Sequence, residues 1–149
     1  MNEYTIPRNN ITLASIIDDA ITLNWQHLNR PHVCGSISDI MDPMTFAREF
    51  RTVKVDVGRQ SGKTAYLANN AQVNDVIVVR DTRTANCMTN VIEFKAPIVS
   101  VYQLERYRLA WTKQDMIVWV DDASHMTKEQ LDCIYSKYVQ FASQFVLLG

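Results

Sequence analysis

The sequence predicts an α/β protein of three layers, with a mostly parallel central sheet and a helical N-terminal extension. From residue 51 onward, strand-like and helix-like segments alternate, a pattern typical of parallel sheets. The run Met116 to Val120 (MIVWV) is wholly apolar, as expected of a strand that is covered on both faces. Residues 12–28 instead repeat apolar side chains every three or four positions, which predicts an amphipathic helix.

The first fifty residues are expected to be helical. The apolar face of the helix over 12–28 consists of Leu13, Ile16, Ile17, Ala20, Ile21, Trp25 and Leu28. A shorter helix should follow in DPMTFAREF, with Asp42 as its cap and Pro43 at its first position. We therefore expect residues 1–50 to lead into a core formed by residues 51–149, all within a single domain of 149 residues.

The core should begin with a strand near 52–57, a helix near 62–71 and a strand over 75–79. TRTANCMTNVIEF reads as a helix, APIVSVYQL as a strand, and Met116 to Val120 as the central strand. Thr127 and Gln130 form a capping-box pattern before another helix, and QFVLLG closes the core as a last strand. The apolar stripe expected on that helix is Leu131, Ile134, Tyr135, Tyr138 and Ala142.

The composition excludes several classes of protein. Fifteen basic and sixteen acidic side chains leave a net charge of -1, so charge alone predicts no attraction to a polyanion. No apolar run is long enough to span a membrane and no leader is recognisable, so we expect a cytoplasmic protein without membrane contact. Three widely separated cysteines without a C-x-x-C pair argue against a disulfide framework and a zinc site.

GRQSGKT (Gly58 to Thr64) lies between a predicted strand and a predicted helix, where a phosphate-binding loop belongs. Its first glycine comes one place late, because Val57 occupies the usual position. Lys63 would bridge phosphate oxygens, and the Thr64 hydroxyl would ligate Mg²⁺. Gly62 would let the backbone approach the anion closely. The segment therefore predicts a nucleotide site, against the alternative of an ordinary capped helix start.

An acidic pair follows the predicted central strand. Asp121 stands where a carboxylate would hold Mg²⁺, and Asp122 where one would orient the attacking water. The alternative is a helix-capping turn, since acids are favourable at helix N-termini. His125 could sense a phosphate, although a surface position is the simpler expectation.

The two motifs together resemble the ATPase core of large terminase subunits of phages, the motors that package viral DNA. That family writes its loop S-R-Q-x-G-K-[ST], which GRQSGKT matches except at Gly58. The resemblance covers roughly residues 50–149 and implies a RecA-like P-loop fold. It implies that Arg59 acts on the phosphates in the manner of an arginine finger. The nucleotide-binding residues that it implies are Gly58, Arg59, Gln60, Ser61, Gly62, Lys63 and Thr64.

The resemblance implies an ATPase that uses ATP and Mg²⁺, with Arg59, Lys63 and Asp122 as catalytic residues and Thr64 and Asp121 at the metal. DNA, further copies of the chain and a larger viral assembly are its candidate partners, and a host cytoplasm its location. Asp122 stands where the family usually has glutamate, so slow or absent hydrolysis is expected. The chain also ends at Gly149, on the strand of the family's coupling motif, so a self-sufficient motor is not expected.

Two other functions remain open from the sequence. One is an ATP-dependent regulatory or assembly subunit with weak hydrolysis, and the other is a nucleoside or nucleotide kinase. Trp25, Gln26 and Phe46 are adenine-contact candidates by position, although core packing is the better expectation for Trp25 and Phe46. Two cationic segments, RDTRT and ERYRLAWTK, could contact nucleic acid, although a solvated face is the simpler interpretation of each.

Overall fold

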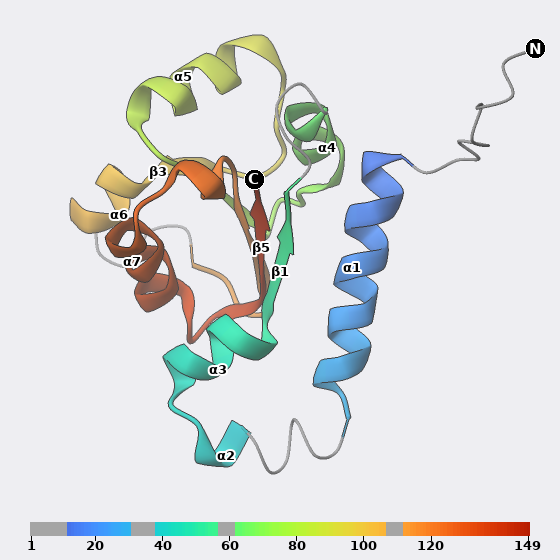
Figure 1. The fold of residues 1–149 in the computed structure, drawn as a ribbon. Helices are drawn as coiled ribbons and strands as arrows, with labels where there is room; N and C mark the ends of the chain where they lie inside the picture. Colours follow the sequence, from blue (N-terminus) through green and yellow to red (C-terminus); the bar gives the residue numbers. More distant parts are fainter. Residues whose placement is uncertain (1–11, 31–37, 57–61, 107–111) are drawn as a thin grey trace, which may run out of the picture.

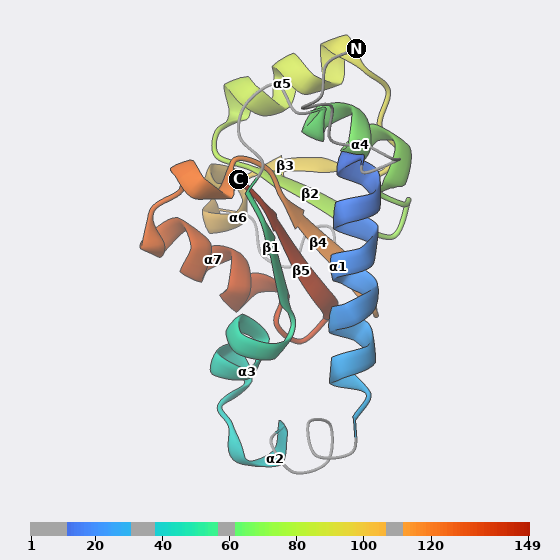
Figure 2. The same ribbon diagram turned by 45° about the vertical axis from the view of Figure 1, so that its right-hand side comes forward.

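The structure is a computed structural model that describes residues 12–30, 38–56, 62–106 and 112–149. It is an α/β fold built on a five-stranded sheet in the order β1-β5-β4-β2-β3, in which every neighbouring pair is parallel. Figures 1 and 2 show this sheet between helices. The strands are β1 (Thr52–Val55), β2 (Val76–Val79), β3 (Ile98–Ser100), β4 (Met116–Val120) and β5 (Ala142–Leu148).

The helices cover both faces of the sheet, which gives three layers. One face carries α1 (Leu13–Leu28), α4 (Lys63–Asn70) and α5 (Thr82–Val91), and the other carries α3 (Pro43–Phe50), α6 (Val101–Arg106) and α7 (Lys128–Tyr138) (Figures 1 and 2). The short α2 (Ser38–Ile40) precedes α3, and the 3₁₀ helix η2 (Ala123–His125) follows β4. The α/β class, the parallel sheet and the helix over 12–28 are therefore confirmed.

Side chains alternate between the two cores along each inner strand. Val76 and Val78 of β2 pack toward α7, whereas Ile77 and Val79 pack toward α4, and all four are fully buried. A strand buried on both faces reads as a continuous apolar run because neither set of side chains meets water. β4 is the third strand of five and follows the same rule, so its predicted central position is confirmed.

The expected strand in APIVSVYQL is wrong beyond its first half. β3 ends at Ser100, and α6 begins at Val101. The backbone N–H of Ser100 donates to the Gln103 side chain at 2.9 Å, while the Gln103 N–H donates to Ser100 Oγ at 3.2 Å. This reciprocal pairing satisfies two donors at a helix start and so ends the strand. The S-x-x-Q pattern from Ser100 to Gln103 is the sequence signal for this helix start.

Two expectations about single residues are also wrong. Ala142 does not belong to the stripe of α7, because that helix ends at Tyr138 and a tight turn leads into β5 at Ala142. Trp25 is not packed in the core, since 52% of its surface is exposed. Phe46, by contrast, is 6% exposed, as expected.

The turn before β2 is fixed by a buried carboxylate. Asp75 is 7% exposed and accepts three hydrogen bonds, from the Gln72 N–H, the Ile117 N–H and the indole N–H of Trp119. A buried carboxylate is stable only when its oxygens are satisfied in this way. Asp75 thus joins the start of β2 to β4, and these three hydrogen bonds give it a role in holding the fold.

Candidate functional site

All five strands point the same way, so their last residues meet at one edge of the sheet, here called the carboxyl edge. In open parallel sheets this edge is where ligands bind. The carboxyl edge carries Lys63 at the start of α4, Asp121 and Asp122 after β4, and Gly149 after β5. The described residues of the two predicted motifs thus lie at one end of the sheet, the end at which the chain terminus marked C lies in Figure 1.

Helix α4 starts at the carboxyl edge because Gly62 turns the chain into it. Gly62 has φ 87° and ψ 17°, a left-handed conformation that glycine adopts at little cost. A Cβ added there would meet nothing within 4 Å, so the backbone angle, and not crowding, calls for glycine. Among the described residues no side chain caps α4, and the N–H groups at its start could bind an anion.

Lys63 reaches across the carboxyl edge from α4. Its ammonium group donates a hydrogen bond to the carbonyl oxygen of Gly149 and lies 3.9 Å from a carboxylate oxygen of Asp122. Only 10% of the Lys63 side chain is exposed. The Lys63 ammonium group is therefore held between the ends of β4 and β5.

Asp121 is a buried carboxylate at the end of β4. It is 7% exposed, its N–H donates to the Val78 carbonyl at 3.0 Å, and its Oδ1 accepts the Asp122 N–H at 3.0 Å. Burial, reinforced by the charge of Asp122, raises the pKa of the Asp121 carboxyl, and the Asp122 N–H and Lys63 offset only part of this rise. Its negative charge is incompletely compensated, which suits a site for a cation.

Asp122 differs from Asp121 in exposure and backbone. Its side chain is 51% exposed, and its φ of 53° is left-handed, which is uncommon for a residue other than glycine. Although it precedes η2, it makes no side-chain capping bond there. The capping interpretation of the acidic pair is therefore not supported, and the carboxylate faces the edge near Lys63.

Lys63 and the acidic pair follow strands that are not neighbours in the sheet. β5 lies between β1 and β4, so the two strands that lead to Lys63 and to the acidic pair are about 10 Å apart, at about 4.8 Å per strand. The residue at the tip of β5 is glycine, which places no side chain in that interval. A Cβ on Gly149 would lie 2.8 Å from the carboxyl carbon of Asp56, so a larger residue would displace that group.

A metal ion would find only part of its ligands in the described protein residues. Thr64 is the second residue of α4 and Asp121 is buried, as above. Within the described ranges, no group of three or more His, Cys, Asp or Glu side chains could hold a metal. Mg²⁺ suits such an open site, because it keeps several waters and takes phosphate oxygens beside one or two carboxylates.

A pocket of about 400 Å³ adjoins the site on the α7 side of the sheet. It shares Gly149 with the Lys63 contact, and Ser124 and Met126 line it after the acidic pair. Lys54 and Asp56, at the end of β1, add opposite charges to its wall. Neither residue was singled out from the sequence, because both fall outside the recognised motifs and only the parallel pairing of β1 with β5 brings them here.

The remaining candidates lie in several places. Gly58, Arg59, Gln60 and Ser61 lie outside the described residues, so their predicted roles stay predictions. His125 is exposed on η2, as expected. Trp25 and Phe46 line a pocket at the other end of the sheet, and Gln26 is exposed on α1. The structure therefore does not bring these three to Lys63.

In both cationic segments, described arginines have a neighbouring partner. Arg80 lies 3.6 Å from Asp81, whose N-cap bonds to Thr84 lower the pKa of its carboxyl, and Arg106 stacks on Tyr102. The solvated interpretation therefore fits these arginines.

Comparisons with known proteins found no match for this chain among family models, curated proteins or solved structures. Among the described residues, no helix has the length and apolar character needed to cross a bilayer.

Proposed function

We propose that the chain is a Mg²⁺-dependent ATPase whose site is the carboxyl edge, and that it serves a viral DNA transaction similar to packaging. The observation that carries the proposal is the meeting of Lys63 with Asp121 and Asp122. These residues come from segments far apart in the sequence, and they bring together a cation that could bind phosphate and two carboxylates, the groups that phosphoryl transfer requires.

In this proposal the start of α4 and Lys63 bind the β and γ phosphates. Lys63 would exchange its hydrogen bond with Gly149 for bonds to phosphate oxygens, which is a short movement of a flexible side chain. Thr64 and Asp121 would hold Mg²⁺, which draws negative charge from the phosphates when it is bound. Asp122 would accept a hydrogen bond from the attacking water, and Arg59 would stabilise the charge that develops on the γ phosphate.

The test is the steady-state release of phosphate from Mg-ATP by the purified protein and by Lys63→Ala. We expect the variant to lose at least about 100-fold in turnover, because a preorganised charge at the reacting phosphate is worth several kcal/mol. Lys128→Ala, which removes an exposed lysine from the start of α7, is the matched control and should keep full activity. Turnover that survives in the Lys63 variant would overturn the assignment.

A nucleotide-dependent regulatory subunit is the second candidate, and Asp122 favours it. Its carboxylate is one methylene shorter than glutamate, half-exposed and directed toward Lys63. These features predict slow hydrolysis beside intact binding. Binding of ATP that depends on Lys63, without turnover by the wild type, would select this candidate over the ATPase.

A further inference from the structure

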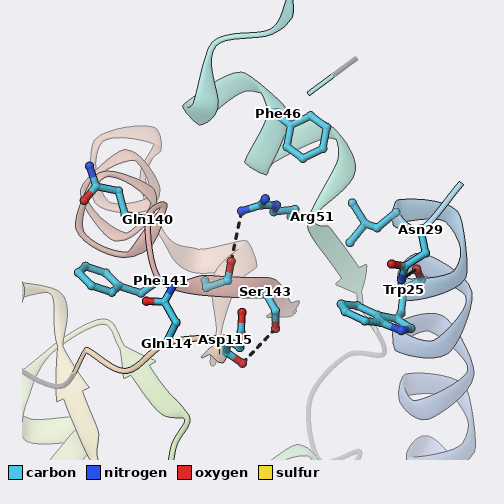
Figure 3. A pocket seen from close by; sticks show the side chains of 11 residues that line it. Trp25, Asn29, Phe46, Arg51, Gln114, Asp115, Gln140, Phe141 and Ser143 are labelled. Carbon is cyan, nitrogen blue, oxygen red and sulfur yellow. Dashed lines mark hydrogen bonds between the residues drawn. The ribbon is translucent and has the colours of Figure 1, made fainter. Parts of the chain in front are cut away.

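A second set of binding groups lies at the opposite end of the sheet, where the strands begin, here called the amino edge. A pocket of about 350 Å³ opens there (Figure 3). Trp25 and Asn29 of α1 stand on one side of it, Gln140 and Phe141 on the other, and the Arg51 side chain extends between them. The pocket therefore combines aromatic surfaces, amides and a cation.

Arg51 is fixed in this position. Its guanidinium carbon lies 5.2 Å from the centre of the Phe46 ring, and its Nη1 donates to the Ala142 carbonyl at 3.4 Å. Trp25 opposite it is 52% exposed, so a ligand in the pocket could reach its indole ring. A planar group that entered the pocket would find the indole available for stacking and the guanidinium beside it.

A second pocket, of about 420 Å³, lies further along the amino edge. It is lined by two lysines, Lys95 and Lys113, with Phe94 between the starts of β2 and β3. The segment before β4 connects the two pockets, because Lys113 lines this one while Gln114 and Asp115 line the first. Asp115 has φ 57°, so each end of β4 carries a left-handed aspartate.

The charges along this edge are mixed but leave the cations accessible. Lys95 and Lys113 are exposed, and Lys113 makes a long contact of 3.5 Å with the Asn74 side chain. Of the acids nearby, Asp75 is turned inward to its three donors, whereas Glu93 and Asp115 are exposed. From β3 to β1 the edge spans four strand spacings, or about 19 Å, long enough for several nucleotides of one extended strand.

We propose that a single strand of nucleic acid binds along the amino edge. One base stacks on Trp25 inside the pocket, and Arg51, Lys113 and Lys95 contact phosphates. Aromatic platforms interleaved with cations are how single strands are held, and a base can enter such a pocket only when it is unpaired. The site is at the opposite end of the sheet from Lys63, so it stands apart from the ATPase proposal.

The experiment measures binding of a labelled oligothymidylate of twelve nucleotides by fluorescence anisotropy. It is done over a range of salt concentrations and without ATP. Trp25→Ala should weaken binding by about 5- to 150-fold, the range for loss of one stacked base. Binding weakens as salt rises, so log K falls with log salt. Lys113→Ala and Lys95→Ala should each make this fall less steep, by about 0.7 in the slope. Asp115→Asn should tighten binding, because it removes a repulsive charge and asparagine tolerates the left-handed backbone.

The controls separate this site from the rest of the surface. Arg83→Ala, on α5 near the carboxyl edge, should leave strand binding unchanged. Lys63→Ala should also bind the strand normally, so a failed ATPase assay leaves this result interpretable. Unfolding midpoints of all variants check that each is folded. An oligouridylate of equal length tells DNA from RNA, and either preference supports the proposal.

Three results would overturn the proposal: no binding of the strand at low salt, wild-type binding by Trp25→Ala and Lys113→Ala together, or tighter binding of a duplex than of the single strand. The gain expected for Asp115→Asn guards against misreading, because an unfolded variant cannot produce it.

Discussion

At the scale of single residues, the carboxyl edge holds one carboxyl group, that of Asp121, whose environment disfavours its charge. Asp121 is buried beside another carboxylate, and its cationic neighbour, Lys63, is shared with Asp122 and Gly149. Ionisable groups with shifted pKa values gather at functional sites, because a group that is costly alone becomes useful when a ligand completes its surroundings. The ionised Asp121 carboxylate should therefore lower the stability of the free protein, although the proposed function would use it.

We predict that Asp121→Asn stabilises the free protein at neutral pH. The folded pKa of Asp121 is raised, so ionisation favours the unfolded chain. The stability linked to this group is complete below the ordinary carboxyl pKa of about 4 and is lost as pH rises through the raised folded pKa. The free energy of unfolding of the variant should exceed that of the wild type at pH 7 and match it near pH 3.

Chemical denaturation at several pH values measures this difference, and Asp39→Asn, at an exposed carboxylate of α2, is the control. The variant should also lose phosphate release. A variant that is less stable than the wild type at pH 7 would show that Asp121 makes a net favourable interaction in the free protein.

Site residues that belong to a recognisable motif could be predicted from the sequence. Residues that reach the site only through the pairing of distant strands could not. Lys63 and the acidic pair follow recognisable patterns, and the structure places them together. The Gly149 carbonyl and the pocket wall formed by Lys54 and Asp56 depend on the parallel pairing of β1 with β5 across about ninety residues, and no local pattern reports that pairing.

At the scale of elements, α1 is joined to the helix that starts the candidate site. The Tyr66 hydroxyl of α4 donates to Asp18 of α1 at 2.7 Å, and the Tyr66 ring meets Trp119 of β4 edge-on at 5.7 Å. Burial and the neighbouring carboxylate raise the pKa of the Tyr66 hydroxyl, so it stays a hydrogen-bond donor at physiological pH. The orientation of α4 thus depends in part on α1.

We predict a measurable coupling between Tyr66 and Asp18. Tyr66→Phe should lower the free energy of unfolding by about 1 kcal/mol, and the double-mutant cycle with Asp18→Ala should give a coupling of about 0.5–1.5 kcal/mol. Urea denaturation of the four proteins measures it, with Tyr102→Phe on the exposed face of α6 as the control. Additive effects of the two substitutions would mean that the bond contributes nothing in solution.

Most elements could be predicted because their signals are local. Asp42 with Pro43, and Thr127 with Gln130, mark helix starts that the structure reproduces, including the hydrogen bonds of both caps. The error at β3 and α6 has a physical origin, because β-branched residues suggested a strand while the Ser100 and Gln103 side chains decided for a helix. Local capping outweighed propensity there.

At the scale of the whole molecule, the first fifty residues contribute to both outer layers of the fold. α1 packs on the same face of the sheet as α4, and α3 packs on the other face beside α7 (Figure 2). The amphipathic pattern predicted a helix over 12–28 but could not tell which element it covers, since any apolar surface satisfies such a stripe.

Matched substitutions on α1 test this packing. Ile17 is fully buried, whereas Leu23 is 65% exposed on the same helix. Ile17→Ala should lower the free energy of unfolding by about 2–4 kcal/mol, and Leu23→Ala by less than about 0.5 kcal/mol. Equal effects in denaturant titrations would indicate that α1 does not rest on the sheet in solution.

The position of Gly149 has a practical consequence for anyone who handles this protein. Its N–H is bonded to Val55 and its carbonyl to Lys63, so any peptide joined after it emerges beside the candidate site. An affinity tag fused directly after Gly149 would add bulk and charge where phosphates are expected to bind. An inactive tagged preparation would therefore say little about catalysis until the tag had been cleaved or moved to the other terminus.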